Sequence, residues 1–131
     1  MAKTRNRYYN PNPMKKEGID CVVRTLCRAM GKDWDTVYKD LCEIGFELKV
    51  MPNDDEAWKE YVKRHNFIEH KLVIKKGMKR PTVQSFATSH KAGTFILQVA
   101  HHLVTCEDGY FYDTWDCGGK SLYKYWEKPS V

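Results

Sequence analysis

The sequence has no long hydrophobic run: nowhere among its 131 residues does an apolar stretch approach the length that crosses a membrane. The opening residues Met1-Ala2-Lys3-Thr4-Arg5 lack the apolar segment of a secretory leader. The five cysteines are odd in number and include no Cys-x-x-Cys pair, so a disulfide framework is not expected. We therefore expect no membrane insertion, a cytoplasmic location and reduced thiols.

Internal repeats, low-complexity segments and a strong charge excess are absent as well. The net charge of +5 permits an acidic partner without demanding one. A hydrophobic content of 42% and a charged content of 30% are ordinary for a globular protein, and 131 residues suffice for a sizeable core. We expect a single domain over residues 1–131, and no metal or organic cofactor, since nothing in the sequence implies one.

The first 17 residues lead to the domain as an extended basic arm. Pro11 and Pro13 exclude a helix here. The arm carries five cations: Lys3, Arg5, Arg7, Lys15 and Lys16. Basic side chains beside Tyr8 and Tyr9 can bind single-stranded nucleic acid through charge and base stacking. The alternative, which we favour, is a solvated arm whose tyrosines pack on the domain.

A central helix is predicted from Cys21 to about position 30. Apolar residues at 22, 23, 26, 27, 29 and 30 cover most of its surface, which is typical of a buried helix. Asp20 is a suitable N-cap, and Gly31 is a suitable C-terminal stop.

The other elements place helices first and strands second. Helices are predicted over 33–43, 53–65 and 82–90, and strands over 67–74, 94–99, 102–107, 110–115 and 121–126, the last at a sheet edge. Gly45 closes the second helix, whose Cys42 we place in the core. This order predicts an α+β fold in which N-terminal helices pack on a C-terminal antiparallel sheet.

Cys21 occupies a position that favours a reactive thiol. At the first turn of a helix, unpaired backbone N–H groups and the helix dipole stabilise negative charge, which lowers the pKa of a thiol and makes it a better nucleophile. The other interpretation is that Cys21 is one more small apolar residue of the core.

The pair Asp108-Gly109 is the strongest hairpin signal in the sequence, and a two-residue turn there sets the strand register. By alternation, one face of the hairpin carries His102, Val104, Cys106, Phe111, Asp113 and Trp115. His102 and Asp113 are diagonal neighbours, about 7–8 Å apart at the backbone and within reach of a side-chain hydrogen bond. Trp115 stands opposite His102 and can shield that bond from water. A histidine oriented by a carboxylate, with a cysteine at a helix N-terminus, is the nucleophile–base–orienter set of covalent acyl transfer.

At these positions the sequence resembles the papain-like cysteine peptidases. That family places its cysteine at the start of the central helix, its histidine at the opening of a strand in the second half, and an Asn or Asp on the next strand. The segments that match this order are Asp20-Cys21, His101-His102-Leu103-Val104 and Asp113-Thr114-Trp115. The last two resemble the family's Asn-His-Ala-Val and Asn-Ser-Trp-Gly. The layout is most similar to compact members found in bacteria and their phages.

The resemblance implies that Cys21 is the nucleophile, His102 the general base and then acid, and Asp113 the group that orients His102. It also implies an oxyanion hole made of the Cys21 backbone N–H and a side-chain donor upstream. Lys15 stands where the family has a Gln. Asn10 or Asn12 can substitute, and we favour Asn12.

Two neighbouring positions depart from the family pattern. Asp20 puts a carboxylate beside the thiol, which opposes the helix dipole, although Arg24 one turn on can neutralise it. Val22 stands where these peptidases often carry a Trp. Both departures leave room for a scaffold that has lost catalysis.

The predicted function is a cysteine-dependent hydrolase of peptide, isopeptide or amide bonds, with a protein or peptide as substrate. A catalytically inactive papain-like binding module is the first alternative, and a single-stranded nucleic-acid-binding protein is the second. A further alternative is a zinc site built from His101, His102, Cys106 and Cys117. The spacing of these residues fits no standard zinc site, and adjacent histidines on a strand face opposite ways.

Overall fold

The computed structural model describes residues 3–130. Within these residues the chain forms four helices and six strands, which makes the fold α+β, as the sequence predicts. In chain order the elements are β1 (Asn6–Tyr8), α1 (Cys21–Met30), α2 (Trp34–Leu48), α3 (Asp55–Arg64), β2 (Ile68–Lys71), α4 (Val83–Ser89), β3 (Thr94–Val99), β4 (His102–Glu107), β5 (Tyr110–Asp113) and β6 (Lys124–Glu127). No helix in this part of the chain is both long and apolar enough to cross a membrane.

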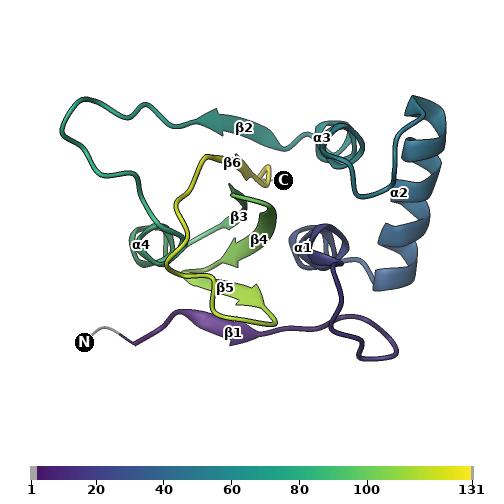
Figure 1. Cartoon of the computed structure of the whole chain (residues 1–131), viewed down its shortest axis with the longest axis horizontal. Coiled ribbons are helices and arrows are strands. Elements are labelled where there is room, and N and C mark those ends of the chain that lie inside the picture. The colour runs from purple at the N-terminus through teal and green to yellow at the C-terminus, as the bar shows by residue number, and fades with distance from the viewer. Residues whose placement is uncertain (1–2, 131) are drawn as a thin grey trace.

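The strands form one sheet with the order β1-β5-β4-β3-β6-β2. Because β1 runs parallel to β5 while the other neighbours are antiparallel, the sheet is mixed rather than antiparallel throughout. Figure 1 shows α1, α2 and α3 gathered on one side and α4 on the other. Side chains alternate along β3, so Ile96 joins the buried cluster of α1–α3, and Phe95 and Leu97 join that of α4.

Helix α1 begins and ends where the sequence predicts. Gly31 follows its last residue in the left-handed conformation, with φ at 66°, which glycine adopts at little cost. Asp20 stands at the N-cap position, but its side chain makes no capping hydrogen bond, so that part of the prediction is wrong. The reason is that its two carboxylate oxygens accept hydrogen bonds from Arg24 and Trp34 instead. The first-turn N–H groups of α1 are therefore left uncapped by Asp20.

Helix α2 continues through Gly45 to Leu48, so the predicted stop at Gly45 is wrong. Glycine is needed there because the chain folds back over the helix: a Cβ at position 45 would lie 2.7 Å from the Val50 carbonyl oxygen. Lys49 ends the helix in the left-handed conformation, and the Val50 N–H donates to the Gly45 carbonyl at 3.0 Å. This close approach holds the loop that leads from α2 to α3.

Cys42 is exposed, so its predicted place in the core is also wrong. Helix α2 turns Val37, Leu41 and Ile44 inward, and position 42 lies about 100° around the helix from Leu41. The helices α3 and α4 lie within one or two residues of their predicted ranges.

The last strand is not at the sheet edge, contrary to the prediction, because β6 lies between β3 and β2. Its Trp126 is buried against Trp58, with ring centroids 4.9 Å apart, and strands on both sides help to exclude water from this contact. Strand β2 forms the edge instead. Its Glu69 and Lys71 are exposed, and charged residues of this kind keep an edge strand from pairing with other chains.

The arm predicted for residues 1–17 is partly a strand, and its residues 1–2 lie outside the described residues. Strand β1 pairs with β5, Tyr9 packs against the α1–α3 cluster, and Tyr8 is exposed. Arg7 stacks on a ring of the domain itself, 3.6 Å from the centre of Tyr110. The prediction that the tyrosines of the arm pack on the domain is therefore confirmed for Tyr9 and wrong for Tyr8.

We expect Gly45→Ala to lower the free energy of unfolding. In an open helix this change stabilises a protein by about 1 kcal/mol, but here the new Cβ must displace the Val50 carbonyl. Glu43→Ala, at an exposed position of the same helix, is the control and should shift that free energy by less than about 0.5 kcal/mol. Chemical denaturation measures both, and a stabilised Gly45→Ala protein would contradict the close approach.

Candidate active site

Two buried threonines dock α1 on β4. The Thr25 hydroxyl donates to the Leu103 carbonyl at 2.9 Å, and the Thr105 hydroxyl donates to the Thr25 carbonyl at 2.6 Å. Both bonds are shielded from water, which strengthens them. They hold the N-terminal half of α1, which starts at Cys21, against β4, which starts at His102.

The β4–β5 hairpin has the register that its two-residue turn predicts, with Cys106 opposite Phe111. This register brings His102 and Asp113 together, and the Nε2 atom of His102 lies 2.5 Å from Oδ2 of Asp113. Trp115 lies beside the histidine, with the two ring centroids 5.0 Å apart. It covers one side of the imidazole while remaining partly exposed itself.

Arg24 joins two carboxylates, of which the sequence indicates only one. Its guanidinium lies 2.7 Å from Oδ1 of Asp20, as predicted, and also 3.0 Å from Oδ1 of Asp113. Arg24 and Asp113 are both buried. Asp113 therefore accepts from His102 on one oxygen, and from Arg24 and the Thr114 backbone N–H on the other.

Cys117 is a further member of this cluster that the sequence places only in a turn. Its buried thiol donates to Oδ2 of Asp113 at 3.4 Å, the same oxygen that faces His102. These three residues offer metal-ligating atoms that all lie within 4.8 Å of one another. However, Nε2 and Oδ2 are at hydrogen-bonding distance, 2.5 Å, whereas two ligands of one zinc ion lie about 3.3 Å apart. The cluster is therefore arranged for hydrogen bonding.

Among the described residues, only two members of the alternative zinc site, His102 and Cys117, are brought together. Cys106 is buried within β4, whereas His101 is exposed in the turn between β3 and β4, with φ at 53°. His101 thus precedes β4, which spans His102–Glu107 as predicted.

The positive charge of His102 and the negative charge of Asp113 stabilise each other. Burial by itself would lower the pKa of His102, but hydrogen bonds with Asp113, Cys117 and Cys21 outweigh it and raise that pKa to about 11. Burial would raise the pKa of Asp113, yet the hydrogen bond and charge of His102, with the charge of Arg24, hold it below its ordinary value. This combination keeps the imidazole protonated and the carboxyl ionised.

Cys21 differs from the buried thiols. Burial opposes its thiolate, but the hydrogen bond and charge of His102, a backbone hydrogen bond from Leu103 and the charge of Arg24 lower its pKa. Burial raises the pKa values of Cys27 and Cys106 to about 12. Burial also raises the pKa of Cys117, although His102 acts against it. Of these four thiols, Cys21 is therefore the one that loses its proton most readily.

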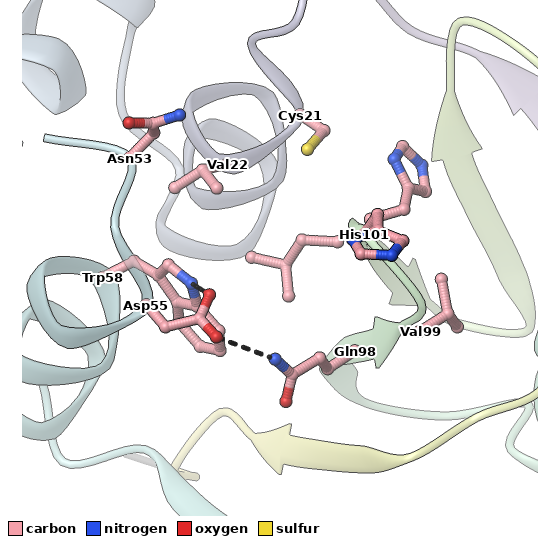
Figure 2. Close-up of a pocket in the computed structure, with 10 residues that line it drawn as sticks. Cys21, Val22, Asn53, Asp55, Trp58, Gln98, Val99 and His101 are labelled. Carbon is pink, nitrogen blue, oxygen red and sulfur yellow. Dashed lines mark hydrogen bonds between the residues drawn. The ribbon is translucent and has the colours of Figure 1, made fainter. Parts of the chain in front are cut away.

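Cys21 and His102 line one pocket, which has a volume of about 350 Å³. The residues around it are Cys21, Val22, Asn53, Asp55, Trp58, Gln98, Val99, His101, His102 and Leu103. Figure 2 shows Cys21 at the start of α1 and, across the pocket, Asp55 hydrogen-bonded to Trp58 and Gln98. These polar groups come from α3 and the end of β3, and nothing in their local sequence marks them as site residues.

Asn12 is not among the described residues that line this pocket. Its Oδ1 accepts the Met14 N–H at 2.8 Å, a turn interaction that asparagine often makes. Asn10 is buried, and its Oδ1 accepts the Asn12 N–H. The geometry gives Asn12 no part in this pocket, and the side-chain amides that do line it belong to Asn53 and Gln98.

The described residues thus define an α+β protein in which a cysteine and a histidine line one pocket and a buried aspartate is hydrogen-bonded to that histidine. Comparisons with family models, with curated proteins and with solved structures found no match for this chain. The resemblance to papain-like peptidases therefore rests on the matched segments of the sequence alone.

We expect Arg24→Leu to lower the free energy of unfolding by about 3–5 kcal/mol at neutral pH, because it removes one of the two cations that face the buried Asp113 carboxylate. Arg28→Leu is the matched control, since Arg28 sits one turn further along the same helix. Its ion pair with Glu107 is partly exposed, and a pair of that kind is worth about 1 kcal/mol or less. Urea denaturation measures the free energy of unfolding of both variants. Equal losses of stability would contradict a larger contribution from the buried Arg24 ion pair.

Proposed function

We propose that this protein is a cysteine-dependent hydrolase of peptide, isopeptide or amide bonds, with Cys21 as nucleophile. The observation that carries the proposal is that Asp113 holds Nε2 of His102 while His102 and Cys21 line the same pocket. A nucleophile, a base and a group that orients the base are the parts that covalent acyl transfer requires.

The papain-like resemblance supports the same assignment. In that arrangement the nucleophile opens the central helix, the base opens a strand of the second-half sheet, and the orienting residue lies on the next strand. Cys21 is the first residue of α1, His102 is the first of β4 and Asp113 is the last of β5. We propose on these grounds that the α+β fold is a compact papain-like domain.

The acylation step follows from the charges. The Cys21 thiolate attacks the carbonyl carbon of the scissile bond, and the negative charge moves to the carbonyl oxygen. The uncapped backbone N–H of Cys21, at the positive end of the α1 dipole, stabilises this oxyanion. Because Asp113 holds Nε2 of His102, Nδ1 is the nitrogen that gives its proton to the leaving amine. The C–N bond breaks, and a thioester on Cys21 remains.

Deacylation reverses the proton's path. A water molecule attacks the thioester carbonyl while Nδ1 of the now neutral His102 takes a proton from it. The C–S bond then breaks, which releases the carboxylic acid and restores the thiolate and the imidazolium. Asp113 keeps the ring in one orientation through both steps, with Arg24 and the Cys117 thiol holding that carboxylate in turn.

The first prediction from this proposal concerns the reactivity of the thiols. At about pH 6 an ordinary thiol, with a pKa of about 8.5, is only about 0.3% thiolate, whereas a thiol with a sufficiently lowered pKa is mostly ionised. Limited alkylation with iodoacetamide at that pH, mapped by mass spectrometry, should therefore label Cys21 before the exposed Cys42.

Two histidine variants give this experiment a matched control. His102→Ala should abolish the preference for Cys21, and His70→Ala, which changes a histidine of strand β2 outside the pocket, should leave it intact. Labelling of Cys21 no faster than Cys42 in the wild-type protein would refute an activated nucleophile.

The second prediction separates a hydrolase from an inactive scaffold that retains a reactive thiol. With p-nitrophenyl acetate, the wild-type protein should release p-nitrophenol over many turnovers, whereas Cys21→Ala should release none above background. His102→Ala should lose at least about a hundredfold in turnover, because no general base then assists hydrolysis of the thioester. Intact-mass spectrometry checks for the acetyl group. A single turnover by the wild-type protein, ending in stably acetylated Cys21, would favour the binding module.

A further inference from the structure

The charged residues of the chain are distributed unevenly. Between Glu69 and Glu107 the sequence contains no Asp or Glu, and this interval carries six cations: Lys71, Lys75, Lys76, Lys79, Arg80 and Lys91. The segment 33–69, which includes α2 and α3, has the opposite bias, with carboxylates in excess. Figure 1 shows the loop between β2 and α4 on the opposite side of the molecule from α2. The basic loop and the acidic helix α2 are therefore far apart.

The loop between β2 and α4, residues 72–82, has a fixed backbone at two points. The Met78 N–H donates to the Lys75 carbonyl at 3.0 Å, and Gly77 takes a positive φ of 86° at the third position of this turn, where glycine is favoured. Near the other end of the loop, the Leu122 N–H donates to the Pro81 carbonyl at 2.8 Å. The cations of the loop are thus carried on a backbone that is ordered before any partner binds.

The exposed cations of this region form no ion pair with a carboxylate among residues 3–130. They are Lys71, Lys75, Lys76, Lys79 and Arg80. Lys71 also stands directly opposite Lys124 in the β2–β6 pair, and like charges in that position repel each other. Glu69 lies 3.7 Å from Lys124 and so offsets only one of the two charges. Unpaired positive charge gathered in this way suits a partner with several negative charges.

An exposed aromatic ring lies beside these cations. The Arg80 guanidinium donates to the Leu122 carbonyl at 3.1 Å, and its central carbon lies 5.5 Å from the centre of the Tyr123 ring. Tyr123 is 47% exposed, so part of its ring is free for a further contact. Proteins that bind single-stranded nucleic acid combine cations for the phosphates with an aromatic ring on which a base stacks. An anionic membrane offers no base for such a ring.

We propose that this surface binds single-stranded nucleic acid. It is called the Tyr123 surface and consists of Lys71, Lys75, Lys76, Lys79, Arg80 and Tyr123. It constitutes a second function, since the described residues that line the Cys21 pocket include none of these six. It is also distinct from the basic arm, where Arg7 already stacks on Tyr110 and Tyr9 packs in the core.

Fluorescence anisotropy of the full chain with a fluorescein-labelled oligodeoxythymidine of about 20 nucleotides tests this proposal. The wild-type protein should bind, and the logarithm of its binding constant should fall linearly with the logarithm of the salt concentration. Lys75→Ser/Lys76→Ser should weaken binding at least about tenfold at about 50 mM salt. It should also make the slope shallower by about 0.7 for each lysine that contacts a phosphate.

Lys39→Ser/Lys63→Ser is the matched control for the charge. It removes two exposed lysines of α2 and α3 and changes the net charge by the same amount, so it should bind within about twofold of the wild-type protein. An equal loss of affinity in the two double variants would overturn the proposal, because net charge and not the Tyr123 surface would then determine binding.

Tyr123→Ala should weaken binding at least about fivefold and leave the salt slope unchanged, because stacking on a base releases no counterion. Tyr123→Phe, which keeps the ring, should bind like the wild-type protein. Tyr38→Ala, which changes a tyrosine of α2 that is 41% exposed, is the control and should also bind normally. Circular dichroism checks that each variant is folded. Normal binding by folded Tyr123→Ala would contradict the stacking contact.

Three further results would overturn the proposal. One is no binding of the oligonucleotide at about 50 mM salt. Another is binding that Tyr8→Ala weakens and Lys75→Ser/Lys76→Ser does not, which would assign it to the arm. The third is binding to vesicles of phosphatidylserine and phosphatidylcholine without binding to the oligonucleotide. Cys21→Ala should bind the oligonucleotide like the wild-type protein, so this proposal and the proposed hydrolase stand or fall separately.

Discussion

The buried guanidinium of Arg24 is the group on which the arrangement around Cys21 depends. A carboxylate as deeply buried as that of Asp113 stays ionised only when cations and hydrogen-bond donors face it. Arg24 faces one oxygen and His102 the other, so the charge of Asp113 is retained, and that charge in turn keeps the imidazole protonated. Arg24 also neutralises Asp20, which removes the repulsion that this carboxylate would exert on a thiolate at the next residue.

Three residues within a stretch of five in helix α1 each contribute a different group to the site. Cys21 supplies the thiol, Arg24 supplies the cation, and Thr25 bonds the helix to β4 through buried hydrogen bonds. Because a helix is stiff over such a short length, the distance from the thiol to the histidine is set by the docking of a single turn on a single strand. Cys21 and His102 both lie on regular elements, α1 and β4. Such rigid elements hold side chains in position more accurately than loops do.

The parts of the site that could be predicted were those with a strong local pattern. Apolar spacing and Gly31 located α1, and the Asp108-Gly109 turn set the register that brings His102 to Asp113. The second partner of Arg24 depends on packing between distant segments, and the place of the Cys117 thiol depends on the turn that follows β5; neither has a local pattern in the sequence. Gly45 misled the prediction because glycine serves both as a helix stop and as a point of close backbone approach, and only the position of Val50 decides between them.

The pairing of β1 with β5 has a consequence for how the chain folds. Tyr8 lies opposite Asp113 in the sheet, and the Tyr9 N–H donates to the Asp113 carbonyl at 3.1 Å, so strand β1 meets β5 at the residue that is hydrogen-bonded to His102. Contacts of such long sequence separation form late, because the intervening chain must first be ordered. During synthesis the Arg24 side chain therefore lacks Asp113 until residue 113 has been added. The polar cluster around Cys21 thus forms only after strand β5 has been synthesised.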